Sequence, residues 1–115
     1  MLRGEIWQVD FNPARGSEAN KIRPAVVVSN DRANATASRL GRGMVTVVPV
    51  TSNVATVYPF QVLLTFGASG LAVDSKAQAE QIRSVAAERF RRRLGHISPA
   101  ELSQIDDALR LHLDL

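Results

Sequence analysis

The segment Pro24–Asn30 reads Pro-Ala-Val-Val-Val-Ser-Asn and contains three consecutive valines. Such a β-branched run, without polar alternation, predicts a strand that is buried on both faces. Upstream, Glu5–Asp10 alternates polar and apolar residues and predicts a strand with one buried face. Downstream, Met44–Thr51 predicts another strand, with Pro49 placing an edge or a bulge near its end.

Further short strands are expected along the rest of the chain. Residues 60–65 predict one, the range 72–85 predicts one or two, and residues 94–97 predict a last one. Gly67–Gly70 indicates a hairpin-like turn, and Asp31–Leu40 a short helical or irregular segment. The sequence therefore predicts an α+β, mostly β fold: a small SH3-like antiparallel β-barrel of six to seven strands.

The C-terminal segment has the clearest helical pattern. Ser98-Pro99-Ala100-Glu101 forms a capping box with proline at the first helical position. Leu102, Ile105, Leu109 and Leu113 follow at helical spacing. An amphipathic helix over about residues 99–113 is expected.

Length and composition exclude several classes of protein. A chain of 115 residues with 45% hydrophobic content predicts one compact domain spanning residues 1–115. The absence of cysteine excludes disulfides, zinc–thiolate sites and thiol catalysis, and two histidines argue against a histidine-rich metal site. The first residues have no apolar signal segment, and no apolar stretch is long enough to span a membrane, so a cytoplasmic location is expected.

The basic residues are compatible with a phosphate-binding surface. The net charge is +3, and twelve of the fourteen basic residues are arginine, whose planar fork suits phosphate. The whole excess lies in residues 1–42, while residues 43–73 are uncharged. Composition alone leaves a nucleic-acid surface and an ordinary solvated face equally open.

The strongest candidate for a functional segment precedes the valine-rich strand. Residues 11–21 predict a loop of about a dozen residues, a length often associated with function. Arg23 stands where this loop enters the strand, and Pro24 restricts the backbone there. The alternative is that Arg23 forms an ordinary surface ion pair with Glu18.

Two other segments are candidates for chemistry. Thr51, Ser52 and Asn53 place two hydroxyls and an amide at the end of a strand, although an ordinary turn explains them as well. In Glu80–Arg83, strand alternation would put Gln81 and Arg83 on one face. The alternative there is an edge strand whose polar residues serve solubility.

In order along the chain, these segments resemble the MazF (PemK/Kid-like) toxins of bacterial toxin–antitoxin systems. The resemblance covers essentially the whole chain. It rests on Arg3-Gly4-Glu5-Ile6-Trp7, Gly16-Ser17-Glu18, Arg23-Pro24, Val26-Val27-Val28-Ser29, Pro49-Val50-Thr51-Ser52, Glu80-Gln81-Ile82-Arg83 and Glu88-Arg89-Phe90.

The resemblance implies a sequence-selective, metal-independent endoribonuclease that cleaves single-stranded RNA without a cofactor. Cleavage would leave a 2′,3′-cyclic phosphate and a 5′-hydroxyl. The protein is expected to be a homodimer, to be neutralised by a MazE-type antitoxin, and to reach operator DNA only through that antitoxin.

The resemblance also implies the site residues. Arg23 and Thr51 match the family's catalytic pair, with Glu18 and Ser52 as candidate support. Because a guanidinium is a poor proton acceptor near neutral pH, Arg23 is assigned to transition-state stabilisation and the general base stays open. The expected RNA-binding residues are Arg15, Ser17, Asn20, Lys21, Asn53, Gln81, Arg83 and Arg89, with Tyr58 or Phe11 available to stack on a base.

Two rival functions remain at this stage. One is a gyrase-poisoning toxin of the same general fold, resembling CcdB, that binds without chemistry. The other is a catalytically silent regulator that binds an antitoxin and its operator DNA.

Overall fold

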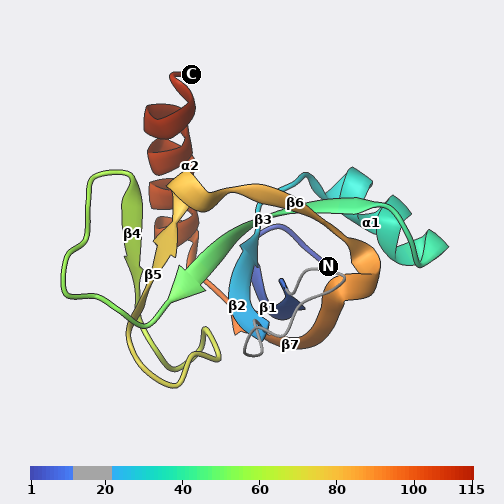
Figure 1. Ribbon diagram of the computed structural model, residues 1–115, viewed down its shortest axis with the longest axis horizontal. Helices are drawn as coiled ribbons and strands as arrows, with labels where there is room; N and C mark the ends of the chain where they lie inside the picture. The colour runs from blue at the N-terminus through green and yellow to red at the C-terminus, as the bar shows by residue number, and fades with distance from the viewer. Residues whose placement is uncertain (12–21) are drawn as a thin grey trace.

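The computed structural model describes residues 1–11 and 22–115, and these residues form a mostly β structure with two helices (Figure 1). The predicted fold class is confirmed. The elements in chain order are β1 (Glu5–Asp10), β2 (Ile22–Val27), α1 (Asp31–Leu40), β3 (Met44–Thr51), β4 (Gln61–Leu64), β5 (Ser75–Gln78), the 3-10 turn η1 (Ala79–Gln81), β6 (Arg83–Ala86), the 3-10 turn η2 (Ala87–Arg89), β7 (Phe90–His96) and α2 (Pro99–Leu113).

The strands pair in an antiparallel sheet that does not close into a barrel. Among the described residues the order is β4-β5-β3-β2-β1-β7, with β6 pairing with β3 beside this path. The expected closed barrel is thus corrected to an open, curved sheet. In a closed barrel the edge strand β4 would pair with another strand. Here helix α2 packs on β4 and η1 instead.

Strand β3 explains how one proline fits inside the sheet. On one side β3 pairs with β2, while on the other side its Met44–Val47 half pairs with β6 and its Val50–Thr51 end pairs with β5. Pro49 lies in the gap between these two partners. Proline has no backbone N–H to donate to a neighbouring strand. On this side of β3 neither β5 nor β6 pairs with Pro49, so no donor is needed there.

The inner strands are buried on both faces, in two separate apolar clusters. Alternation along β2 sends Val26 to one cluster and Val27 to the other. Helix α2 covers the first cluster with Ile105 and Ala108, and Ala37 of α1 joins the second. The members from β1 to β3 are Ile6, Val26, Val48 and Val50 in the first cluster, and Val9, Ala25, Val27, Val45 and Val47 in the second.

The boundaries of two strands differ from those expected. Strand β2 ends at Val27, because the N–H groups of both Val28 and Ser29 donate to the carbonyl of Thr46, which turns the chain toward α1. Strand β7 begins at Phe90, although its Arg91–Arg93 run gives no apolar alternation. A charged strand at the end of a sheet is a common protection against edge-to-edge association.

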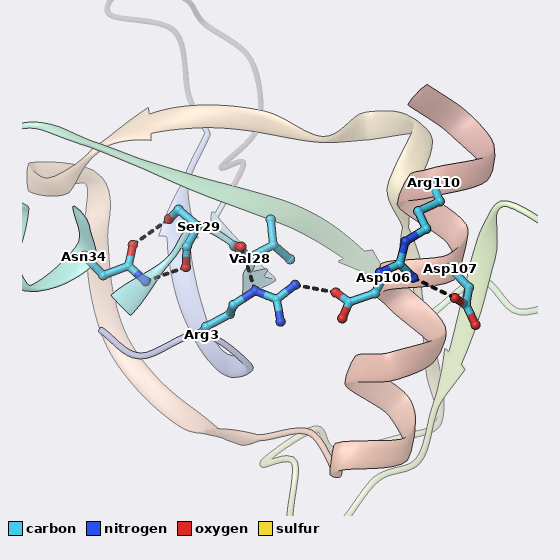
Figure 2. Close-up of polar contacts among 7 residues, drawn as sticks. All are labelled: Arg3, Val28, Ser29, Asn34, Asp106, Asp107 and Arg110. Atoms are coloured by element: carbon cyan, nitrogen blue, oxygen red, sulfur yellow. Dashed lines mark hydrogen bonds and ion pairs between the residues drawn. The ribbon is translucent and has the colours of Figure 1, made fainter. Parts of the chain in front are cut away.

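The N-terminal segment is tied to α2 by one arginine. Figure 2 shows Arg3 between Val28 and Asp106: its Nε donates to the Val28 carbonyl at 3.0 Å, and its guanidinium pairs with the Asp106 carboxylate of α2. In the same view the Asn34 amide donates to the Ser29 carbonyl at 2.8 Å. These contacts fix α1 and α2 to the same end of β2.

The chain between β4 and β5 packs closely against β7. Gly70 has a φ of +79°, and a Cβ at this position would lie 2.1 Å from the Leu94 carbonyl oxygen of β7. Gly67, in the same turn, has a φ of +100° but open space around it. Position 70 therefore requires glycine both for its positive φ and for space beside β7, whereas position 67 requires it only for its positive φ.

Substitution of these two glycines separates the steric from the conformational requirement. We expect Gly70→Ala to lower the free energy of unfolding by about 3 kcal/mol or more, because strain at positive φ adds to overpacking against fixed backbone. Gly67→Ala should cost about 1–2 kcal/mol from the backbone alone. Urea unfolding of both variants measures the difference, and equal losses would contradict the close packing on β7.

Acid should weaken the attachment of α2 through Glu101. Burial alone would raise the pKa of Glu101, but hydrogen bonds from the N–H groups of Ser98 and Thr65 and from their hydroxyls outweigh it and hold the pKa below 4.5. The unfolded chain then binds this proton more readily, so the stabilisation is present above about pH 4.5 and is lost as the pH falls through the lowered value.

We therefore expect Glu101→Gln to unfold more easily than the wild type at pH 7 and to lose part of the wild type's decline in stability below pH 4.5. Urea unfolding at pH 7 and at pH 3.5 gives both values. An unchanged pH dependence would show that Glu101 has its ordinary pKa in the folded protein.

Candidate active site

The pairing of β2 with β3 brings the two ends that were expected to hold the site to the same place. Ala25 lies opposite Pro49, and Val26 lies opposite Val48. The β2–β3 ladder ends at this first pair, and Arg23 and Thr51 each lie two residues beyond it, near the start of β2 and at the end of β3. Antiparallel pairing thus brings the strand ends that carry a guanidinium and a hydroxyl to the same edge of the β2–β3 ladder.

Arg23 and Thr51 line one groove with a volume of about 500 Å³. Ser52, expected to be a supporting hydroxyl, also lines it. The other described residues around the groove come from three places: Gln8, Pro24 and Val50 from the inner strands, Gly70, Leu71, Ala72, Val73 and Ser75 from the segment that leads into β5, and Arg92 and Leu94 from β7.

The described lining of the groove is cationic. It includes two arginines, Arg23 and Arg92, and no aspartate, glutamate or histidine. Both guanidiniums are exposed, and within residues 1–11 and 22–115 neither has a hydrogen bond or an ion pair. The surface ion pair between Arg23 and Glu18 concerns a residue outside the described part of the chain. An anion entering this groove would meet two unneutralised cations.

The turn after β3 orients Thr51. The backbone N–H of Asn53 donates to the Thr51 Oγ1 at 3.2 Å, and the N–H of Ala55 donates to the Asn53 side-chain oxygen at 3.2 Å. Because Oγ1 accepts this bond, the hydroxyl hydrogen of Thr51 remains available to donate to a ligand. Asn53, expected to bind RNA, thus lies beside the groove, where its backbone supports Thr51.

Two of the expected RNA-binding arginines lie in a different hollow. Arg83 and Arg89 line a second depression together with Phe11, which shares no described residue with the groove of Arg23. The Arg83 guanidinium sits 5.1 Å from the centroid of the Phe11 ring, and Arg89 donates to the Asp10 carbonyl. The Phe11 ring already stacks with Arg83, and Tyr58 already stacks with Phe60 at 5.4 Å.

Gln81 does not share a strand face with Arg83, so this expectation was wrong. Residues 79–81 form the 3-10 turn η1, and β6 begins only at Arg83. The alternation of a strand therefore does not connect the two side chains. Gln81 is exposed on η1. Arg15, Ser17, Glu18, Asn20 and Lys21 lie outside the described residues.

Sequence reasoning missed Gln8 and Arg92 as groove residues. Gln8 lies on β1 opposite both Pro24 of β2 and Arg92 of β7. The run Arg91–Arg93 could have indicated a groove arginine, since successive residues of a strand point to opposite faces of the sheet. Which of the three arginines faces the groove depends on the register with β1, which the sequence does not state.

Residues 1–11 and 22–115 contain no group of three or more histidine, cysteine, aspartate or glutamate side chains placed to hold a metal ion. Within the same residues, every helix is too short or too polar to cross a membrane.

Comparison with known proteins agrees with this architecture. The sequence is 74% identical over 115 residues, all of this chain and 98% of the relative, to a protein named endoribonuclease MazF9 from Mycobacterium tuberculosis. In structure it is similar to MazF in a MazE–MazF crystal structure from Deinococcus radiodurans, with a TM-score of 0.79, 26% identity, and coverage of 100% of this chain and 96% of that one.

A second structural neighbour is an endoribonuclease from a mycobacterial species, with a TM-score of 0.75, 26% identity, and coverage of 100% of this chain and 92% of that one. The sequence also matches the family described as the PemK-like, MazF-like toxin of type II toxin–antitoxin systems over residues 2–113. The groove between β2 and β3 and the match over nearly the whole chain lead to one conclusion: this chain belongs to the PemK/MazF-like family of toxins.

Proposed function

We propose that this protein, as a single domain of residues 1–115, is an endoribonuclease toxin that cleaves single-stranded RNA in the groove of Arg23 and Thr51. The observation that supports this most is the pair itself: a guanidinium and a hydroxyl at facing strand ends, in one cationic groove. The 74% identical relative is named an endoribonuclease. Cleavage would inhibit translation and growth by destroying RNA.

The chemistry fits these two groups. RNA supplies its own nucleophile: the 2′-oxygen attacks the adjacent phosphorus, the bond from phosphorus to the 5′-oxygen breaks, and a 2′,3′-cyclic phosphate and a 5′-hydroxyl result. Arg23 donates two N–H bonds to the non-bridging oxygens as negative charge develops there. Thr51 donates its hydroxyl hydrogen to the same phosphate, with Ser52 as a further donor at the rim.

The proton of the 2′-hydroxyl needs an acceptor. A guanidinium does not accept a proton near neutral pH, and the described lining of the groove offers no carboxylate and no imidazole. Glu18, from the segment that precedes Arg23, is our candidate for this role. Arg23 donates its hydrogen bonds throughout and can also protonate the leaving 5′-oxygen.

We expect Arg23→Ala to cleave RNA 10²–10³ times more slowly than the wild type, because loss of one preorganised donor to a developing oxyanion typically costs that much. Binding to RNA should change far less. The measurement is single-turnover cleavage of a long single-stranded RNA in the presence of EDTA, with the fragment ends analysed for cyclic phosphate and 5′-hydroxyl.

Arg42→Ala is the matched control, because Arg42 is an exposed arginine two residues before β3 begins, whereas Thr51 is where β3 ends. Its cleavage rate should equal that of the wild type. Wild-type kinetics in Arg23→Ala would remove Arg23 from the chemistry. Intact RNA together with inhibited gyrase would instead indicate a toxin that binds without cleaving, and neither effect would indicate a silent regulator.

Selection of the RNA sequence is proposed for the segment that contains Arg15, Ser17, Asn20 and Lys21, together with Asn53 and Gln81. Splayed single-stranded bases present their hydrogen-bonding edges to such side chains. Replacing residues 15–21 by the segment of a relative should change the cleaved sequence while the cleavage rate at the new sequence stays comparable. Mapping cut sites on one long RNA tests this, and an unchanged map would place selection elsewhere.

The proposal extends to partners and location. We propose a homodimer in the cytoplasm, where messenger RNA is available, that a MazE-type antitoxin neutralises by covering the RNA groove. The relative from Deinococcus radiodurans is recorded in complex with MazE, which supports this partner. In the complex the antitoxin would cover the cations of the groove, so the toxin would have no free cationic groove for DNA. Operator DNA would therefore be bound only through the antitoxin.

A further inference from the structure

Three consecutive arginines on β7 have different surroundings. Arg91 pairs with the Asp10 carboxylate at 3.0 Å, and Arg93 pairs with the Glu5 carboxylate at 2.8 Å. Arg92, between them, is exposed, and no hydrogen bond or ion pair engages it within the described residues. Both neighbours are thus neutralised by β1, while the charge of Arg92 is not.

Strand register places Arg92 on the groove. Arg92 lies opposite Gln8 of β1, and Gln8 lies opposite Pro24 of β2. Val50 of β3 lies one residue beyond the Ala25–Pro49 pair at which the β2–β3 ladder ends. Directly paired residues point to the same face of a sheet, and all four line the groove of Arg23. The paired residues Pro24, Gln8 and Arg92 thus form a row in the groove lining that ends at Arg92 on β7.

Arg23 and Arg92 both line the groove, so an anionic strand lying in it can meet both charges. Arg23 on β2 and Arg92 on β7 are separated by β1, hence by two strand spacings, or about 10 Å between backbones. The described lining between them is apolar or neutral. Two like charges on one groove repel each other in the empty protein, and an anion bound at each would remove that repulsion.

We propose that Arg92 is a second phosphate-binding residue, which holds a phosphodiester next to the scissile one and so fixes where the RNA strand lies along the groove. The proposal rests on RNA as the substrate. Arg92 acts through its charge and not by reading a base. It therefore contributes to affinity for every sequence equally and contributes to salt dependence, because each neutralised phosphate releases counterions.

The experiment measures RNA binding as a function of salt, with a random-sequence single-stranded 2′-fluoro RNA as the probe, which lacks the nucleophilic 2′-hydroxyl. For single strands each phosphate contact contributes about 0.7 to the slope of log K against log salt. We expect Arg92→Gln to bind roughly tenfold more weakly at low salt and to lose about 0.7 of that slope.

Matched variants separate this role from others. Arg42→Gln makes the same charge change two residues before β3, and about 23 Å of strand separates Met44, where β3 begins, from Thr51; this variant should bind as the wild type does. Arg92→Lys keeps the charge and should keep the slope. On cleavable RNA, Arg92→Gln should lower kcat/KM roughly tenfold while the map of cut sites stays the same.

An unchanged slope in Arg92→Gln, an equal loss in Arg42→Gln, or no binding of RNA by the wild type would overturn the proposal. An altered map of cut sites would show that Arg92 reads bases and would overturn it too. A wild type that binds RNA with a slope dependent on Arg92 but cleaves none would instead refute the proposed ribonuclease activity and leave this site standing.

Discussion

The burial of β1, β2 and β3 on both faces is the constraint on which the rest of the structure depends. Each strand sends alternate residues into two separate apolar clusters, so Val26 and Val27, neighbours in sequence, are both fully buried. Only β-branched or small apolar residues suit such positions over several residues in a row. A helix packs on each cluster: α2 covers the first with Ile105 and Ala108, and α1 contributes Ala37 to the second.

The groove follows from where that burial stops. Strand β2 enters the core after Arg23, and β3 leaves the core at Thr51. Because these strands are antiparallel, the start of one and the end of the other meet at one edge of the buried region. Polar side chains at this edge can be accommodated without replacing apolar residues of the core. Arg23 is accordingly exposed, while Ala25, two residues along, is fully buried, and the site is held rigidly by a core to which it contributes little.

Much of this architecture could be predicted from local patterns. The alternation of Glu5–Asp10 and the capping box at Ser98 gave the bounds of β1 and α2 as the structure has them. Strand β7 was underestimated, because charged residues at 91–93 mask the apolar pattern on which strand prediction depends. The 3-10 turn η1 was missed as well, since Ala79 and Glu80 continue the polar–apolar alternation of β5 into the turn.

The site was predictable in part for the same physical reason. Arg23 and Thr51 flank apolar runs, and antiparallel neighbours bring such flanks together, so a common groove could be expected before the register was known. Arg92 could not be assigned, because its orientation depends on irregular pairing. The β1–β7 register shifts between Ile6 and Trp7 and again between Gln8 and Val9, and no sequence pattern marks either position.

These two shifts decide which arginine faces the groove. Ile6 lies opposite Gly95, and an unbroken register from that pair would set Gln8 opposite Arg93. The first shift leaves Leu94 without a partner on β1 and brings Arg92 opposite Gln8 instead. A slip of one residue turns every side chain of a strand to the other face, so this bulge directs Arg93 to the Glu5 carboxylate. The bulge at Leu94, which packs against Gly70, therefore leaves the charge of Arg92 available to a ligand. Its neighbours Arg91 and Arg93 form ion pairs with β1 and so stabilise the edge of the sheet.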